Sequence, residues 1–171
     1  GAVDALRAAG AETIDGVDLG PVHEIDDPEM EVLLTELAAD LGGYLSARGA
    51  GPRALEDLVR FNREHASTEL RWFGQELFEQ ALAKGGLDSP AYKTALATCR
   101  RLARDEGIDA ALAKHRLDLL VAPTGGVAWM IDLVNGDSFT GSSSAPAAVA
   151  GYPSITVPSG LSNAHPRAVP A

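Results

Sequence analysis

Apolar side chains recur at helical spacing through much of the N-terminal two thirds of the chain. The most regular run follows the segment DPE at positions 27–29. An aspartate that can cap, a proline in the first turn and an acid near the positive end of the helix dipole predict a helix start there. The apolar period continues to about Ala47, and Gly49 predicts the end of the helix. We expect its apolar stripe to cover a core, because helices of a small domain bury one face against another layer.

Further helices are predicted on both sides of this one from the same period of apolar residues. A helix that opens at Ser89-Pro90 can run through Gly107, because one glycine costs only about 1 kcal/mol relative to alanine. The predicted segments are residues 2–9, 55–65, 75–83 and 89–115.

Two short segments rich in valine, isoleucine and leucine, residues 119–122 and 155–157, predict buried strands. Each runs into a proline, which cannot donate a hydrogen bond to a sheet ladder, so each strand is expected to end there. A long loop and a short helix over residues 145–150 lie between them. This order suits a crossover between neighbouring parallel strands. The predicted fold class is therefore α/β: a mixed β-sheet with covering helices, rich in helix.

The short helix has clear local signals at both ends. Ser143 or Ser144 can cap its start, Pro146 suits its first turn, and Gly151 suits its end. The small residues Ala147, Ala148 and Ala150 are expected to let it approach the sheet closely.

Composition narrows the classes of function. The 171 residues, of which 46% are hydrophobic, suit one domain with a real core. A net charge of −10 argues against nucleic acid and anionic membranes as partners. The single cysteine, Cys99, excludes an internal disulfide and lies on an apolar stripe, where we expect an unreactive thiol. No signal peptide or spanning segment is evident, so a cytoplasmic location is expected, and no cofactor or metal site is predicted.

The stretch from residue 117 to residue 160 also carries a family resemblance. APTGG, then GD, then SSSAPAAVAGYPSITVPSG resembles the C-terminal half of the amidase signature family, in its branch of peptide amidases and amidotransferase A subunits. The upstream segments FNREHASTELRWFGQELFEQA and VDALRAAGAETID extend the resemblance to residue 2. It implies that residues 1–160 are the C-terminal portion of an amidase-signature domain. Residues 161–171 depart from the family pattern and are expected to be an irregular tail.

The resemblance implies an amide hydrolase that uses a serine, a cis-serine and a lysine. That set lies in the N-terminal half of the family, and its signature is not in this sequence, so no catalytic residue is assigned. We expect the loop between the predicted strands to bind substrate, because open α/β sheets place ligands at the carboxyl ends of strands. In the family, the region that contains Trp72 and Phe73 packs near the substrate cleft, which implies that these side chains line it; core packing is the alternative. The predicted substrate-binding residues are Asp132, Asp137, Thr140, Ser142, Ser143, Ser144, Trp72 and Phe73.

Two other interpretations of the loop are weaker. The segment GDSF at positions 136–139 resembles the first block of GDSL-type esterases, but Ser138 comes late and His165 lacks an aspartate three residues before it. The run of serines at 142–144 resembles a nucleophile, yet a serine needs a base and no lysine follows Lys114. Capping and turn roles are favoured for these serines.

Two functions remain open from the sequence. The first is a fragment of an amidase that acts on carboxamides or peptide amides, carries the substrate side and is inactive alone. Its partner would be a small amide or peptide amide substrate in the full-length enzyme. The second is a non-catalytic binding or scaffolding module derived from an amidase.

Overall fold

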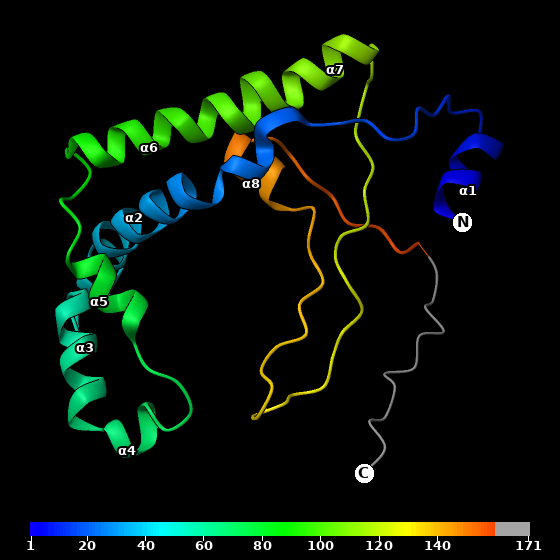
Figure 1. The fold of residues 1–171 in the computed structure, drawn as a ribbon. Helices are drawn as coiled ribbons and strands as arrows, with labels where there is room; N and C mark the ends of the chain where they lie inside the picture. The colour runs from blue at the N-terminus through cyan, green and yellow to red at the C-terminus, as the bar shows by residue number, and fades with distance from the viewer. Residues whose placement is uncertain (160–171) are drawn as a thin grey trace. The chain divides into compact units, whose positions relative to one another are not determined.

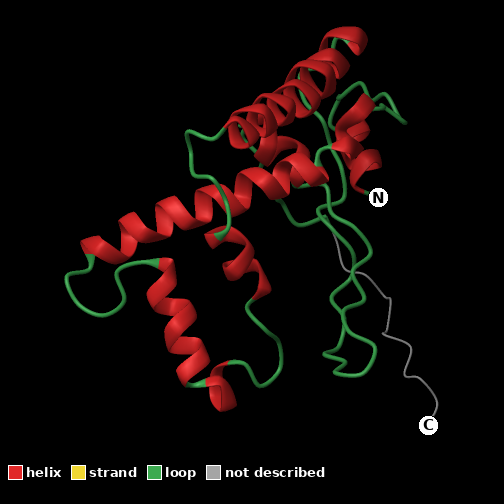
Figure 2. Ribbon diagram, turned by 60° about the vertical axis from the view of Figure 1, so that its left-hand side comes forward, coloured by secondary structure: helices red, strands yellow, loops and turns green. Residues whose placement is uncertain are grey.

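The computed structural model describes residues 1–159, and these residues form helices and loops without a β-strand (Figures 1 and 2). The one β-type pairing among them is an isolated antiparallel bridge between Gly125 and Ser142. The predicted mixed sheet is therefore wrong for this chain. Residues 161–171, the predicted irregular tail, lie outside the described residues.

The error has a physical cause. A strand requires a neighbouring backbone to pair with its N–H and C=O groups, and residues 119–122 and 155–157 form no such ladder in the described chain. Their apolar side chains are exposed instead, as at Leu119 and Ile155. An apolar pattern shows that a segment favours burial, but it does not supply the partner.

The chain divides into two compact units. One unit comprises His23–Leu102, and the other comprises Gly1–Val22 together with the chain from Ala103 onward. No helix in the described part is long and apolar enough to cross a bilayer.

The His23–Leu102 unit is a cluster of helices in which α2 contacts three others. Helix α2 begins at Asp26, one residue before the predicted cap, and ends at Ala47 as predicted. Helix α6 has the predicted cap, because the Ser89 hydroxyl accepts a hydrogen bond from the Tyr92 N–H at 3.2 Å. Its helices are α2 (Asp26–Ala47), α3 (Leu55–Glu64), α4 (Ala66–Glu69), α5 (Glu76–Leu82) and α6 (Pro90–Arg100).

Leucine packing and polar ties hold this unit together. Leu34 of α2, Leu55 of α3 and Ala81 of α5 form its buried apolar cluster. At the edge, the Tyr92 hydroxyl donates to Glu36 of α2 at 2.7 Å, so α6 is tied to α2 by a hydrogen bond as well as by packing. Cys99 is buried and free, and desolvation raises the pKa of its thiol, so the expected unreactive thiol fits its surroundings.

The second unit is built around the continuation of α6. The π-helix η2 (Arg101–Asp109) and α7 (Ala110–His115) follow α6 without a break, so the predicted long helix through Gly107 is confirmed. This π-helical stretch was not predicted. The unit also holds α1 (Ala2–Ala8), part of the 3₁₀-helix η1 (Gly20–Glu24) and α8 (Ala145–Ala150).

Glycine is required where the N-terminal segment meets η2. Gly20 has a φ of +65°, and a Cβ added there would lie 3.2 Å from the carbonyl oxygen of Glu106. Both the positive φ and the close approach therefore disfavour any side chain at this position. The backbone of the N-terminal segment therefore approaches η2 closely at Gly20.

The bounds of α8 are those predicted from its local signals, with Gly151 in the left-handed region at φ 74°. One of the three small residues named above is buried. Ala148 is exposed, whereas Ala150 is buried with 5% of its surface accessible. Of the three small residues expected to allow a close approach, Ala150 is therefore buried and Ala148 is not, and no sheet is present in the described chain for the helix to approach.

Candidate functional site

The loop between α7 and α8 is closed at its neck by an antiparallel bridge of two backbone hydrogen bonds. Gly125 and Ser142 are paired in this bridge: the Gly126 N–H donates to the Gly141 carbonyl at 3.3 Å, and the Ser143 N–H donates to the Thr124 carbonyl at 3.3 Å. These bonds make residues 124–143 a closed loop with a defined base, although its two arms form no extended ladder.

Thr140 lies against the neck. A Cβ added to Gly126 would lie 1.8 Å from the Thr140 hydroxyl oxygen, far inside contact distance. The predicted site residue Thr140 therefore sits over a backbone position that accommodates only glycine without rearrangement. This close approach explains why a glycine follows Gly125 at the neck.

The three serines bind the loop to the chain that enters it. The Ser142 hydroxyl donates to the Thr124 carbonyl at 3.2 Å, and the Ser143 hydroxyl donates to the Pro123 carbonyl at 2.6 Å. The Ser142 and Ser144 hydroxyls lie 2.9 Å apart and share a hydrogen bond. None of the hydrogen bonds described for these hydroxyls involves a lysine or histidine, which a serine nucleophile would need. The geometry supports the turn role, although Ser144 occupies the N-cap position of α8 without a side-chain capping bond.

Asp132 organises the far end of the loop. Its carboxylate accepts hydrogen bonds from the Val134 N–H and the Asn135 N–H, each at 2.9 Å, and from the Asn135 side-chain amide at 2.7 Å. The hydrogen bond from the Asn135 backbone N–H, followed by that from its side chain, holds the pKa of Asp132 below its usual value. A carboxylate that accepts these hydrogen bonds from its own loop serves mainly to form the turn.

Asp137 has a more open environment. Its carboxylate accepts one hydrogen bond, from the indole N–H of Trp129 at 3.2 Å, and Trp129 meets the edge of Phe139 with ring centroids 6.3 Å apart. A carboxylate can accept about four hydrogen bonds, so Asp137 retains capacity for another donor. No hydrogen bond joins either aspartate to the three serines in the described chain. Whether these residues share one binding site therefore remains a prediction.

The two predicted aromatic residues lie in the other unit, on the loop between α4 and α5. Trp72 is 64% exposed and Phe73 is 79% exposed, so the alternative of core packing is not what the structure shows for these side chains. The Arg71 guanidinium lies 4.7 Å from the centroid of the Trp72 ring, a cation–π arrangement. Their predicted role at a substrate cleft is not tested by these contacts.

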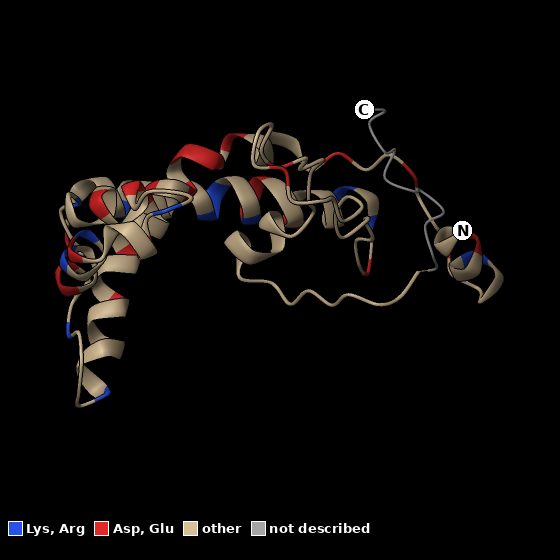
Figure 3. Ribbon diagram, turned by 90° about the horizontal axis from the view of Figure 1, so that it is seen from below, with Lys and Arg blue, Asp and Glu red and all other residues tan. Residues whose placement is uncertain are grey.

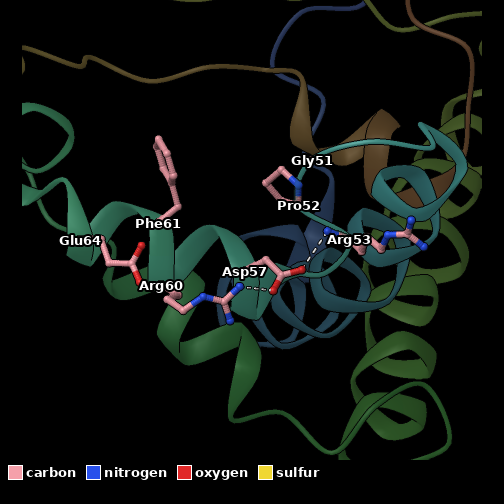
Figure 4. A pocket seen from close by; sticks show the side chains of 7 residues that line it. All are labelled: Gly51, Pro52, Arg53, Asp57, Arg60, Phe61 and Glu64. Carbon is pink, nitrogen blue, oxygen red and sulfur yellow. Dashed lines mark hydrogen bonds and ion pairs between the residues drawn. The ribbon is translucent and has the colours of Figure 1, made fainter.

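A shallow cavity of about 290 Å³ lies at the start of α3 (Figure 4). Its charged floor is internally satisfied: the Asp57 carboxylate accepts from the Arg53 N–H at 2.9 Å and pairs with the Arg60 guanidinium at 2.6 Å. The Arg53 backbone hydrogen bond, and next the Arg60 hydrogen bond, lower the pKa of Asp57. We interpret this feature as the capping of α3 and not as the substrate site. The described residues contain no cluster of three or more potential metal ligands.

An anchor that the sequence did not indicate holds α8 in its unit. The Tyr152 hydroxyl, just after α8, donates to the Asp109 carboxylate at 2.5 Å, and the Arg104 guanidinium lies 5.1 Å from the Tyr152 ring centroid. The partners are 43 positions apart, so no local period could have found them. We call Tyr152, Asp109 and Arg104 the tyrosine anchor.

The tyrosine anchor predicts a loss of stability at alkaline pH. The hydrogen bond to Asp109 raises the pKa of Tyr152, so folding favours the protonated phenol. This contribution is complete below the ordinary tyrosine pKa of about 10 and is lost as the pH rises through the folded-state pKa. Tyr152→Phe is therefore expected to be less stable than the parent at pH 8, and the difference should narrow above about pH 10. Urea unfolding at pH values across this range measures the difference in stability between the variant and the parent. Tyr44→Phe, at an exposed tyrosine, is the control. A stability difference for Tyr152→Phe that does not change with pH would contradict the proposed role of the Tyr152 hydroxyl.

The loop, its serine-bound neck and the motifs of residues 117–160 together define a class of protein. Comparison with protein-family models and with curated proteins gives no match. Solved structures, however, confirm the resemblance: the chain belongs to the amidase signature family.

The similar structures are peptide amidases. The peptide amidase PAM in complex with the competitive inhibitor chymostatin is 49% identical with a TM-score of 0.89, over 95% of this chain and 33% of that one. The crystal structure of PAM12A gives the same values. The native peptide amidase from Stenotrophomonas maltophilia is 45% identical with a TM-score of 0.79, over 88% of this chain and 30% of that chain. The chain thus spans about a third of the length of these relatives, consistent with a C-terminal portion.

Proposed function

We propose that this chain forms the substrate-side portion of an amide hydrolase of the peptide amidase type. The observation that carries the proposal is 49% identity to a peptide amidase over 95% of the chain. That relative binds chymostatin as a competitive inhibitor, so its site accepts a ligand in competition with substrate. We infer a peptide amide as the ligand class for the enzyme to which this portion would contribute.

Asp137 is the best candidate in this chain for direct contact with a substrate amide. It is exposed and has one hydrogen-bond donor in Trp129, whose ring in turn meets the edge of Phe139. An amide N–H can donate to the remaining oxygen lone pairs, and an apolar side chain of the substrate can pack on the rings. Asp132 and the three serines would shape the loop that presents Asp137, because their hydrogen bonds already engage the loop itself.

The chemical step would come from outside this span. Acyl transfer by a serine requires an activated hydroxyl to attack the amide carbon and backbone N–H groups to stabilise the oxyanion. In the described chain, the Ser142 and Ser143 hydroxyls donate to carbonyls, and the Ser142 and Ser144 hydroxyls share a hydrogen bond. We therefore infer that the chain alone does not hydrolyse amides.

The test uses the isolated chain and a grafted enzyme, in which this chain replaces the matching span of the peptide amidase from Stenotrophomonas maltophilia. Ammonia release from peptide amides is expected from the grafted enzyme and not from the isolated chain. Asp137→Asn in the grafted enzyme should raise KM by about tenfold or more with a smaller effect on kcat, as expected for a lost hydrogen bond to a charged group. Asp118→Asn, at another exposed aspartate of the same segment, is the matched control and should leave both constants unchanged.

Two results would overturn the proposal. Turnover by the isolated chain that Ser138→Ala or Ser143→Ala abolishes would establish a local serine nucleophile. A folded grafted enzyme that binds no peptide amide and releases no ammonia would favour the binding or scaffolding module instead.

A further inference from the structure

The helix between α6 and α7 is wound more widely than an α-helix. The π-helix η2 spans nine residues, and its backbone hydrogen bonds join residues five positions apart, whereas those of an α-helix join residues four apart. Such stretches are rare and are frequently found at functional sites. The side chains of η2 show what the wider winding achieves here.

The first consequence concerns the buried face of η2. Ala103 is 0% exposed, and Ile108, five positions later, is 7% exposed. In an α-helix, residues five positions apart point about 140° away from each other, because 3.6 residues complete a turn. An α-helical winding would therefore turn Ile108 away from the face of Ala103 and bring Glu106, which is exposed in η2, toward that face. The π-helix keeps the apolar side chain buried and the charged one in solvent.

The second consequence concerns the tyrosine anchor. The stretch that contains η2 carries basic and acidic residues (Figure 3). Among them, the Arg104 Nε atom lies 3.8 Å from the Asp109 carboxylate, again five positions later. The carboxylate accepts the hydrogen bond from the Tyr152 hydroxyl, and the Arg104 guanidinium lies 5.1 Å from the Tyr152 ring centroid. An α-helical winding would direct Arg104 and Asp109 about 140° apart and would separate this pair.

We propose that η2 is a conformational device that contains one residue more than an α-helix needs and thereby assembles the tyrosine anchor. Two independent pairs support this, because Ala103 with Ile108 and Arg104 with Asp109 have the same spacing of five. Tyr152 directly follows α8, which begins beside the serine-bound neck of the loop, so the winding of η2 also determines where the neck is held. This role does not depend on the proposed function.

Deletion of Asp105 from the isolated chain tests the proposal. Asp105 is exposed and lies between the members of both pairs, so its removal makes both spacings four. Residues four apart share one face of an ordinary α-helix, so both pairs should persist. The deletion variant should therefore melt within about 4 °C of the parent. Tyr152→Phe should lower the melting temperature by about 4 °C or more at pH 8, both in the parent and in the deletion variant.

The matched control is deletion of Ala97, an exposed residue of α6. The winding there is α-helical, so the deletion turns every later side chain of the helix by about 100° relative to the earlier ones. It should lower the melting temperature by more than about 10 °C or abolish cooperative unfolding.

An alanine inserted after Asp105 is the opposite change. It makes both spacings six, which neither an α-helix nor a π-helix places on one face. The tyrosine anchor should then be lost, so that Tyr152→Phe changes the melting temperature of the insertion variant by less than about 1 °C. The Ser143 N–H, which donates to the Thr124 carbonyl at the neck, should exchange at least about tenfold faster than in the parent.

The contrary results are distinct. Destabilisation by the Asp105 deletion as large as that by the Ala97 deletion would show that η2 does not contain a surplus residue. An Asp105 deletion variant that is indifferent to Tyr152→Phe, or an insertion variant that responds to it like the parent, would show that the winding of η2 does not assemble the tyrosine anchor. If the insertion variant does not unfold cooperatively, the comparison of the two deletions and the response of the Asp105 deletion variant to Tyr152→Phe decide the question.

Discussion

Leu55→Ala is expected to lower the free energy of unfolding of the His23–Leu102 unit by about 2–5 kcal/mol. Leu55 is 1% exposed and packs with Leu34 and Ala81 where α2, α3 and α5 meet. Truncation removes buried methyl groups and leaves a cavity that three helices would have to close together. Urea unfolding followed by circular dichroism measures the change.

The matched control for this prediction is Leu33→Ala on α2. Leu33 is 53% exposed, so its truncation removes little buried area and should change the stability by less than about 1 kcal/mol. A loss at Leu55 no larger than that at Leu33 would show that the buried cluster does not stabilise this unit.

Ala150→Leu is expected to destabilise the second unit by about 1–3 kcal/mol. Ala150 is 5% exposed at the end of α8, and three added carbon atoms would have to displace well-packed neighbours. Ala148→Leu, two residues earlier on the same helix, is the matched control. Ala148 is exposed, so its variant should remain within about 0.5 kcal/mol of the parent. Thermal unfolding of the two variants measures the difference, and the opposite order would show that α8 packs by its other face.

The Ala150 substitution also bears on the candidate site. Helix α8 begins next to Ser144 and is followed by Tyr152, so it links the serine-bound neck of the loop to the tyrosine anchor. A shift of α8 should therefore loosen the Ser143 contact with the Pro123 carbonyl as well as the core. Hydrogen exchange of the Ser143 N–H, which donates to Thr124, would report this loosening.

Part of the candidate site could be predicted from the sequence because its determinants are local. The serines before α8 act in turn formation, as their position before a proline-containing helix start suggested. Asp132 forms its turn with residues two and three positions ahead, which is short-range chemistry of the same kind. The contact of Tyr152 with Asp109 and the close approach of Thr140 to Gly126 were not predictable, because they join segments whose proximity only the folded chain creates.

The helices and the predicted strands show the same difference between local and long-range determinants of structure. A helix forms its backbone hydrogen bonds between residues four positions apart, so its signals are local. The spacing of apolar residues, the capping residues and the terminal glycines were therefore enough to predict the end of α2, the long helix through Gly107 and the bounds of α8. A strand takes its hydrogen bonds from a distant segment, so the apolar residues 119–122 and 155–157 could not show whether a partner backbone was present. The sequence was limited in the same way in predicting which face of a short helix is buried. Both Ala148 and Ala150 suited a buried position, and the neighbours of α8 in the tertiary structure decided that Ala150 is the buried one.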